Sequence, residues 1–241
     1  MELSKVIGII SYLPNDRENR EWRQTRLNNL LDACQRFFPT LPIIIVAQNW
    51  PEDLYKGRAN TFIHRYDRPL TIVGARRELR RLFLEQYNYD YLIMLDDDCE
   101  LHCGAVDISK EDCTKTYLEQ IDENPDCWIE SCGSLLKLFA ISREVFKGVD
   151  YDNVSLERRE GYEDWVFYEK LKSLYPNKRR RFRNVQIFQS STSTADQHST
   201  WYENQSVDLR DLLEKTVYLA RKYNKDFTIG PVPIPPKDEH E

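Results

Sequence analysis

The stretch YDYLIMLDDDCEL, residues 89–101, places four apolar residues, 92–95, directly before three aspartates, Asp96, Asp97 and Asp98. A short apolar run of this kind predicts a buried strand. Carboxylates in close contact repel one another and are costly to desolvate. The three aspartates therefore indicate either an exposed acidic loop or a divalent cation that relieves their repulsion.

The residues before this stretch alternate between strand and helix patterns. Apolar runs predict strands, and apolar residues at helical spacing predict helices. This alternation favours an α/β fold with a mostly parallel, Rossmann-like sheet that helices cover on both faces. Ligands bind outside the carboxyl ends of such strands, where the three aspartates fall, so we favour the cation over the loop. The predicted strands cover 5–13, 41–50, 60–67 and 90–98, and the helices 15–38 and 71–87.

Beyond residue 101 the pattern is looser and predicts a mixed C-terminal part. In the helix at 162–176, Trp165 and Val166 fall off the apolar stripe formed by Phe167, Tyr168, Leu171, Leu174 and Tyr175. The basic run NKRRRFRN, 177–184, is interpreted as a solvated connection. The remaining predicted elements are a helix at 109–125, a strand and short helix at 132–149, a strand at 185–191 and a helix at 206–223.

Composition places the chain among ordinary soluble globular proteins. Its 241 residues are 41% hydrophobic and 31% charged, and the net charge of −6 gives no overall basic field for nucleic acid. None of the six cysteines forms a CxxC pair, and a zinc site at Cys99, His102 and Cys103 lacks an evident fourth ligand. Without a visible signal peptide or membrane-spanning run, we expect a cytoplasmic protein, with peripheral membrane association as the alternative.

The acidic residues fall into two groups with distinct chemistry. On an extended segment Asp96 and Asp98 point the same way, and carboxylate oxygens suit Mg²⁺ or Mn²⁺. Asp97 points elsewhere, where a ribose hydroxyl or a sugar is a plausible partner. In EGYEDWVFYEKL, 160–171, Glu163 and Asp164 begin a helix. They either complement the helix dipole and cap it, or supply a general base for an acceptor hydroxyl.

These features together resemble a nucleotide-sugar-dependent glycosyltransferase of the GT-A fold. An apolar strand ends in LDDD, a glycine-bearing strand lies near CGSLLKLFAISREVF, and GYEDW opens a helix, in that order over about residues 6–174. The resemblance implies that Asp96 and Asp98 hold Mn²⁺ or Mg²⁺ on the donor diphosphate. It implies that Asp164 is the base of an inverting transfer and that Glu163 orients hydroxyl groups. It also implies a further metal ligand, His198 in STADQHSTW, with Asp196 as a second candidate.

The resemblance also assigns a donor site at the end of the first strand. There, in SYLPNDRENR, the nucleotide base and ribose are expected to contact Ser11, Tyr12, Leu13 and Arg17. The segment VGARRELRR resembles the part of the family that faces the donor phosphates or ribose. The helix terminus that follows Gly74 favours anions, and Arg76 and Arg77 are suited to pair with phosphate. The alternatives are plain packing for Tyr12 and a solvated basic helix face for the two arginines.

The predicted protein is one GT-A-like catalytic domain over residues 1–225, with a nucleotide-binding half at 1–101 and an acceptor half at 102–225. A proline-rich acidic tail follows at 226–241. Its predicted partners are a nucleoside diphosphate sugar and an acceptor that is a glycan, a lipid-linked group, a protein or a nucleic acid.

Several alternatives stay open. A nucleotidyltransferase usually carries a glycine-rich segment after its first strand, which SYLPNDREN lacks. A glycosyltransferase acting on DNA bases would bind the nucleic-acid backbone through the basic run at 178–183. The acidic net charge of the chain argues against this function. A non-catalytic nucleotide- or carbohydrate-binding module would need neither acidic group. For the enzyme, a transfer that retains stereochemistry is the alternative to one that inverts it.

Overall fold

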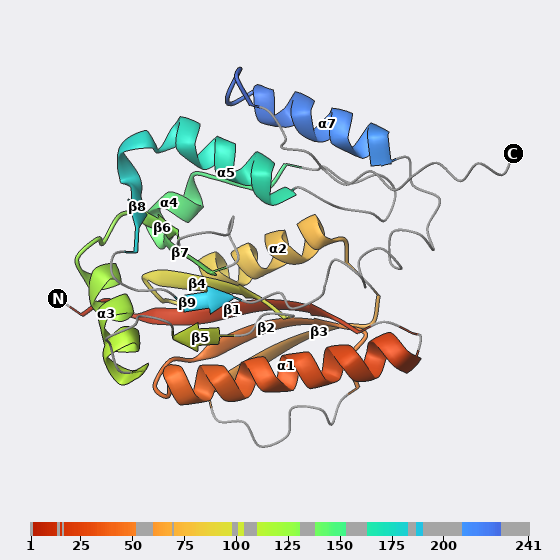
Figure 1. Ribbon diagram of the computed structural model, residues 1–241, viewed down its shortest axis with the longest axis vertical. Helices are drawn as coiled ribbons and strands as arrows, with labels where there is room; N and C mark the ends of the chain where they lie inside the picture. Colours follow the sequence, from red (N-terminus) through yellow and green to blue (C-terminus); the bar gives the residue numbers. More distant parts are fainter. Residues whose placement is uncertain are drawn as a thin grey trace, which may run out of the picture.

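The computed structural model of the chain is shown in Figure 1. It describes residues 2–13, 15, 17–51, 60–68, 70–97, 101–103, 110–130, 138–152, 163–182, 187–189 and 209–227. The predictions for Asp98, Asp196 and His198 lie outside these residues, as does the tail from residue 228 onward.

A seven-stranded sheet with the order β3-β2-β1-β4-β7-β6-β8 forms the centre of the molecule. Strands β1 to β4 are parallel, and β7 pairs antiparallel with both β4 and β6. β8 pairs parallel with β6. The strands are β1 (Lys5–Tyr12), β2 (Ile43–Gln48), β3 (Thr61–Tyr66), β4 (Tyr91–Asp96), β6 (Trp128–Glu130), β7 (Leu138–Ser142) and β8 (Arg179–Arg181). A separate antiparallel pair joins β5 (Leu101–Cys103) to β9 (Ile187–Gln189).

Helices cover both faces of the sheet. One face packs on α1 (Arg17–Phe37) and α3 (Lys110–Asp122). The other packs on α2 (Ile72–Arg81), its π-helical extension Leu82–Gln86, α4 (Arg143–Lys147) and α5 (Glu163–Leu174). Helix α7 (Leu209–Arg221) lies outside α5 (Figure 1). A 3-10 turn, Pro176–Lys178, precedes β8. Among the described residues, none of the helices is both long and apolar enough to cross a membrane.

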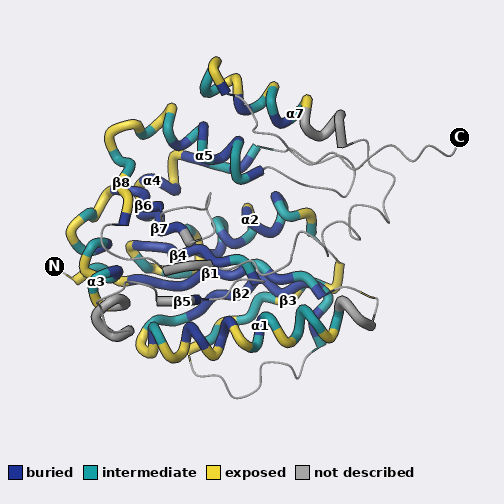
Figure 2. Tube along the Cα trace, viewed as in Figure 1, coloured by how far each residue is buried: buried dark blue, intermediate teal, exposed yellow. Residues whose placement is uncertain are grey.

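The central strands are buried on both faces, which explains their nearly continuous apolar sequences (Figure 2). In β4, Ile93 and Leu95 face the α1 side, whereas Leu92 and Met94 face the α2 side. Gly8 of β1 lets α2 approach closely, because a Cβ there would lie 2.7 Å from Leu92 and 2.9 Å from Leu79. The predicted fold class, a mostly parallel α/β sheet with flanking helices, is confirmed.

Three strands differ from the prediction, and one of them, the short β5, was not predicted. The short β6 was not predicted, because three residues are too few to show a period. The basic run predicted to be a solvated connection instead contributes β8, an edge strand. There Arg179 and Arg181 both contact Glu130 of β6, at 2.6 Å and 2.5 Å. Charged residues on an edge strand discourage pairing with other chains.

Helix α5 confirms part of the predicted apolar stripe. Phe167 and Leu171 are buried, but Leu174 is 48% exposed, because the helix ends there. Val166, off the predicted stripe, packs with Ala220 of α7 and with Phe227, and Trp165 packs against the same cluster. A second helix thus covers the outer face of α5.

Candidate functional site

A buried arginine joins the two predicted acidic groups. The Nη2 of Arg76 lies 3.1 Å from the Oδ1 of Asp96 and 3.2 Å from the Oδ1 of Asp164. Its Nε lies 3.5 Å from the Oε1 of Glu163, and the Arg76 side chain is only 4% exposed. These four residues are called the Arg76 centre below.

Three elements place this centre at the carboxyl edge of the sheet. Asp96 is the last residue of β4, Arg76 lies in α2, and Glu163 and Asp164 form the first turn of α5. Carboxylates in a first helical turn are stabilised by the helix dipole. Glu163 and Asp164 therefore stabilise the start of α5 and at the same time lie close to the guanidinium of Arg76.

The charges of the centre perturb one another. Burial opposes the charged form of Arg76, but the carboxylates of Asp164 and Asp96 outweigh it and hold the guanidinium pKa well above its ordinary value. Burial raises the pKa of Glu163, and the charge of Arg76 only partly opposes this. Burial therefore makes the Glu163 carboxyl group easier to protonate than an ordinary glutamate.

Tyr151 supports Arg76 from the side of α5. The guanidinium carbon of Arg76 lies 5.9 Å from the centroid of the Tyr151 ring, within cation–π range. That ring stacks on Phe167 at 3.9 Å and an interplanar angle of 9°. The hydroxyl of Tyr151 lies 3.7 Å from the Sδ of Met94. Tyr151 is thereby held between β4, α5 and Arg76.

The second aspartate has a different arginine as its partner. The Nη1 of Arg23, in α1, lies 2.6 Å from the Oδ1 of Asp97. The Ser11 hydroxyl donates to the Oδ2 of Asp97 at 2.6 Å and accepts from the Nε1 of Trp50 at 3.0 Å. Consecutive residues of an extended segment point to opposite faces. Asp96 and Asp97 thus avoid mutual repulsion, each paired with an arginine from a helix on its own side.

The other predicted donor residues are placed unequally. The side chain of Leu13 is buried in the core on the α1 side, and Tyr12 is half-buried at the end of β1. Ser11 meets Asp97, as described above. The backbone of Arg17 begins α1, and its side chain lies outside the described set.

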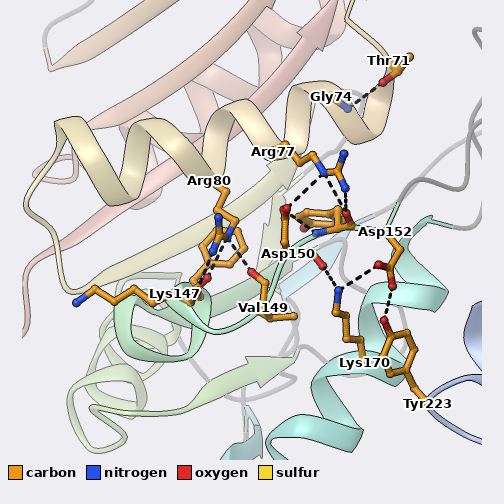
Figure 3. Close-up of polar contacts among 12 residues, drawn as sticks. Thr71, Gly74, Arg77, Arg80, Lys147, Val149, Asp150, Asp152, Lys170 and Tyr223 are labelled. Atoms are coloured by element: carbon orange, nitrogen blue, oxygen red, sulfur yellow. Dashed lines mark hydrogen bonds and ion pairs between the residues drawn. The ribbon is translucent and has the colours of Figure 1, made fainter.

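Arg77 and Arg80 face the end of α4 and the segment that follows it (Figure 3). The Nε of Arg77 donates to the Tyr151 carbonyl at 3.0 Å. The Nε of Arg80 donates to the carbonyls of Val149 at 2.7 Å and Phe146 at 3.0 Å. These two arginines therefore satisfy backbone groups near the end of a short helix.

The sequence analysis missed Gln48, the last residue of β2. Gln48 is buried, and its Oε1 has no hydrogen-bond partner among the residues that the structure describes. In register it lies between Tyr12 of β1 and Tyr66 of β3, at the same edge as Asp96. Its only sequence signal is a polar amide that ends the apolar run IIIVAQ. A buried polar atom without a partner needs an explanation, and a bound ligand would supply one.

A divalent cation fits part of this site. Arg76 occupies one oxygen of Asp96, whose other oxygen, Oδ2, is a hard ligand suited to Mg²⁺ or Mn²⁺. Within the described ranges, no three His, Cys, Asp or Glu residues are grouped so as to hold a metal. The metal set predicted from Asp96, Asp98 and His198 therefore remains a proposal.

Solved structures of S. aureus TarS share this fold. TarS 1–349 is 12% identical with a TM-score of 0.52, and the match covers 92% of this chain and 73% of that one. A longer TarS chain is 12% identical with a TM-score of 0.55. That match covers 92% of this chain and 43% of the TarS chain, so this chain spans less than half of it. TarS 1–349 in complex with UDP-GlcNAc is 10% identical with a TM-score of 0.56, and the match covers 91% of this chain and 67% of that one. No family model matches the sequence, and neither does any curated protein.

Strand order, flanking helices and these neighbours together define the class of the protein. It is an α/β protein with a GT-A-like, Rossmann-type fold. At such low identity the likeness concerns the fold, and function must be argued from the site.

Proposed function

We propose that this protein is a glycosyltransferase that moves a sugar from a nucleoside diphosphate donor to an acceptor hydroxyl. The observation that carries the proposal is the Arg76 centre. A strand-end aspartate and an acidic helix start meet there at one buried guanidinium, at the edge where open α/β sheets bind ligands. The neighbour solved with UDP-GlcNAc supports a nucleotide sugar as the donor class.

The nucleotide end of the donor is proposed to lie at the ends of β1 and β2. Tyr12 offers an aromatic ring there, and the amide of Gln48 can both donate to and accept from a base. Arg76 and Asp96 lie beside the proposed diphosphate position, and the resemblance adds Asp98 and His198 as further metal ligands. These acidic residues and the histidine would hold Mn²⁺ or Mg²⁺, which when bound neutralises charge on the diphosphate.

The proposed transfer is a direct displacement with inversion. The acceptor oxygen forms a bond to the anomeric carbon as the bond from that carbon to the phosphate oxygen breaks. The acceptor proton moves to the carboxylate of Asp164, and the nucleoside diphosphate leaves with the electron pair. The carboxylate of Asp164 is paired with Arg76 until it takes the proton, and Glu163 orients hydroxyl groups.

A thermal-shift screen of nucleoside diphosphates and their sugars, with Mn²⁺ or with chelator, tests this proposal. A ligand that binds only the folded state raises its melting temperature. We expect one nucleotide to do so only with metal, and Asp98→Asn to abolish that shift. Asp126→Asn is the matched control, because Asp126 is exposed and lies at the other end of β4 from the site. Its neighbour Cys127 accepts a hydrogen bond from Tyr91, the first residue of that strand. The absence of any nucleotide-dependent shift, with or without metal, would contradict the proposal.

A further inference from the structure

A polar cluster outside the Arg76 centre joins three parts of the chain (Figure 3). The hydroxyl of Tyr223, which follows α7, donates to the Oδ2 of Asp152 at 2.5 Å. The Nζ of Lys170, in α5, lies 3.3 Å from the Oδ1 of Asp152 and donates to the Asp150 carbonyl at 2.8 Å. Asp152, Lys170 and Tyr223 are called the clamp below.

The clamp is partly withdrawn from solvent. The side chains of Lys170 and Asp152 are 15% and 24% exposed, so water and salt screen their attraction less than in a surface pair. The Nζ of Lys170 also lies 5.6 Å from the centroid of the Tyr223 ring. Burial, followed by the hydrogen bond to Asp152, raises the pKa of Tyr223, so its hydroxyl remains a donor at neutral pH.

The segment that the clamp holds, residues 150–152, carries Tyr151. On its other side Arg77 donates to the Tyr151 carbonyl, and its Nε lies 3.5 Å from the Oδ2 of Asp150. The Tyr151 N–H donates to the Oδ1 of Asp150 at 2.8 Å. The segment is therefore fixed from α2 and from α5 and α7 together. Its central ring lies against the guanidinium that joins the acidic residues.

We propose that Lys170 and Tyr223 are positioning residues for transfer. By holding residues 150–152 they keep Tyr151 against Arg76, and so keep Arg76 in the position that bridges Asp96 and Asp164. The reaction thereby depends on the docking of α7 onto α5, a dependence that rests on the proposed glycosyltransferase function. No atom of the clamp touches the reacting groups in this scheme, and its effect passes through Tyr151.

Tyr223→Phe removes the hydroxyl and keeps the ring that packs beside α5 and Lys170. Loss of positioning can cost catalysis up to about a hundredfold, so we expect kcat to fall about tenfold or more. The KM for the donor should change less than about twofold, because the clamp does not line the proposed nucleotide position. The melting temperature should stay close to that of the unmodified protein.

Asn224→Ala is the matched control. Its Nδ2 donates to the Oε2 of Glu169 at 2.9 Å, which is also a bond from the end of α7 to a carboxylate of a neighbouring element. Among the described residues its side chain bonds Glu169 and the Asp226 N–H and forms no hydrogen bond to residues 150–152, so we expect kcat to be unchanged. Lys170→Arg, which retains the charge, should keep more activity than Lys170→Met. Equal effects of Tyr223→Phe and Asn224→Ala on kcat, or unchanged kcat in Tyr223→Phe, would overturn the proposal.

Hydrogen exchange separates this inference from the proposed function. In Tyr223→Phe the backbone amides of residues 150–152 should exchange faster, whereas in Asn224→Ala they should not. If the unmodified protein transfers no sugar, the proposed function fails, and the exchange rates still decide whether the clamp holds Tyr151. Unchanged exchange in Tyr223→Phe would overturn the clamp even in an active enzyme.

Discussion

The Nη2 of Arg76 lies 3.2 Å from the Oδ1 of Asp164, although 88 residues separate them in the sequence. The same nitrogen lies 3.1 Å from the Oδ1 of Asp96. One buried guanidinium therefore pairs both with Asp96, on the proposed donor side, and with Asp164, the proposed base. A charge at this position stabilises carboxylates that would otherwise repel one another. The site is therefore assembled around Arg76.

Replacing Arg76 should destabilise the protein strongly. Removing one partner of buried ion pairs leaves uncompensated charge and costs about 3–5 kcal/mol. We expect Arg76→Gln to lower the free energy of unfolding by about this amount in urea titrations. Lys115→Gln, which removes the cation of an exposed pair with Glu119, should cost less than about 0.5 kcal/mol. Similar costs for the two variants would refute the role of Arg76.

Asp164→Asn should separate binding from chemistry. The amide cannot take the acceptor proton, so transfer should fall about a hundredfold or more. Donor binding, measured as the metal-dependent thermal shift, should persist, because Asp96 and Asp98 are unchanged. Full transfer activity in this variant would remove Asp164 from the mechanism.

Glu163→Gln should change how stability depends on pH. Because burial raises the folded-state pKa of Glu163, the folded state binds this proton more tightly than the unfolded state. The stability of the unmodified protein relative to the variant should therefore fall as pH rises above the ordinary value of 4.5. Urea titrations at several pH values measure this difference. A relative stability that rises over this range would show that Arg76 outweighs burial.

Gln48→Leu should weaken nucleotide binding without destabilising the free protein. One neutral hydrogen bond contributes about 0.5–1.5 kcal/mol, so we expect the Kd to rise about two- to tenfold. Because the Oε1 of Gln48 lacks a partner among the described residues, removing this oxygen breaks no hydrogen bond to them. Gln86→Leu, at an exposed position, is the control and should leave the Kd unchanged. An unchanged Kd in Gln48→Leu, measured by calorimetry, would exclude Gln48 from the base site.

Tyr117→Phe should raise stability. The Tyr117 ring is fully buried and stacks on Phe182 at 4.0 Å, but its hydroxyl has no hydrogen-bond partner among the described residues. A buried hydroxyl without a partner costs about 1–3 kcal/mol, so its removal should increase the free energy of unfolding by about 1 kcal/mol. A decrease would mean that the hydroxyl is satisfied in solution.

The sequence predicted the central elements because their patterns are local. Apolar runs gave β1, β2 and β4, and the aspartates after Leu95 marked the edge where the site lies. The helix at Glu163 followed from its acidic start and its apolar spacing. The three-residue strands β6 and β8 depend on pairing with distant strands, and no local period predicts them.

The sequence alone could not distinguish the roles of the arginines in VGARRELRR. Adjacent helical side chains point in different directions, and which direction meets carboxylates depends on what packs against the helix. Only the tertiary structure turns Arg76 toward Asp96 and Asp164 while Arg77 meets the Tyr151 carbonyl.

The sequence by itself determined the α/β framework and the position of its acidic edge, because alternation and helical spacing are written in neighbouring residues. Tertiary structure alone decided the partner of each acid: Arg23 for Asp97 from one face, and Arg76 for Asp96 and Asp164 from the other. Ion pairs across such separations depend on how helices pack on a sheet, which local sequence patterns do not specify.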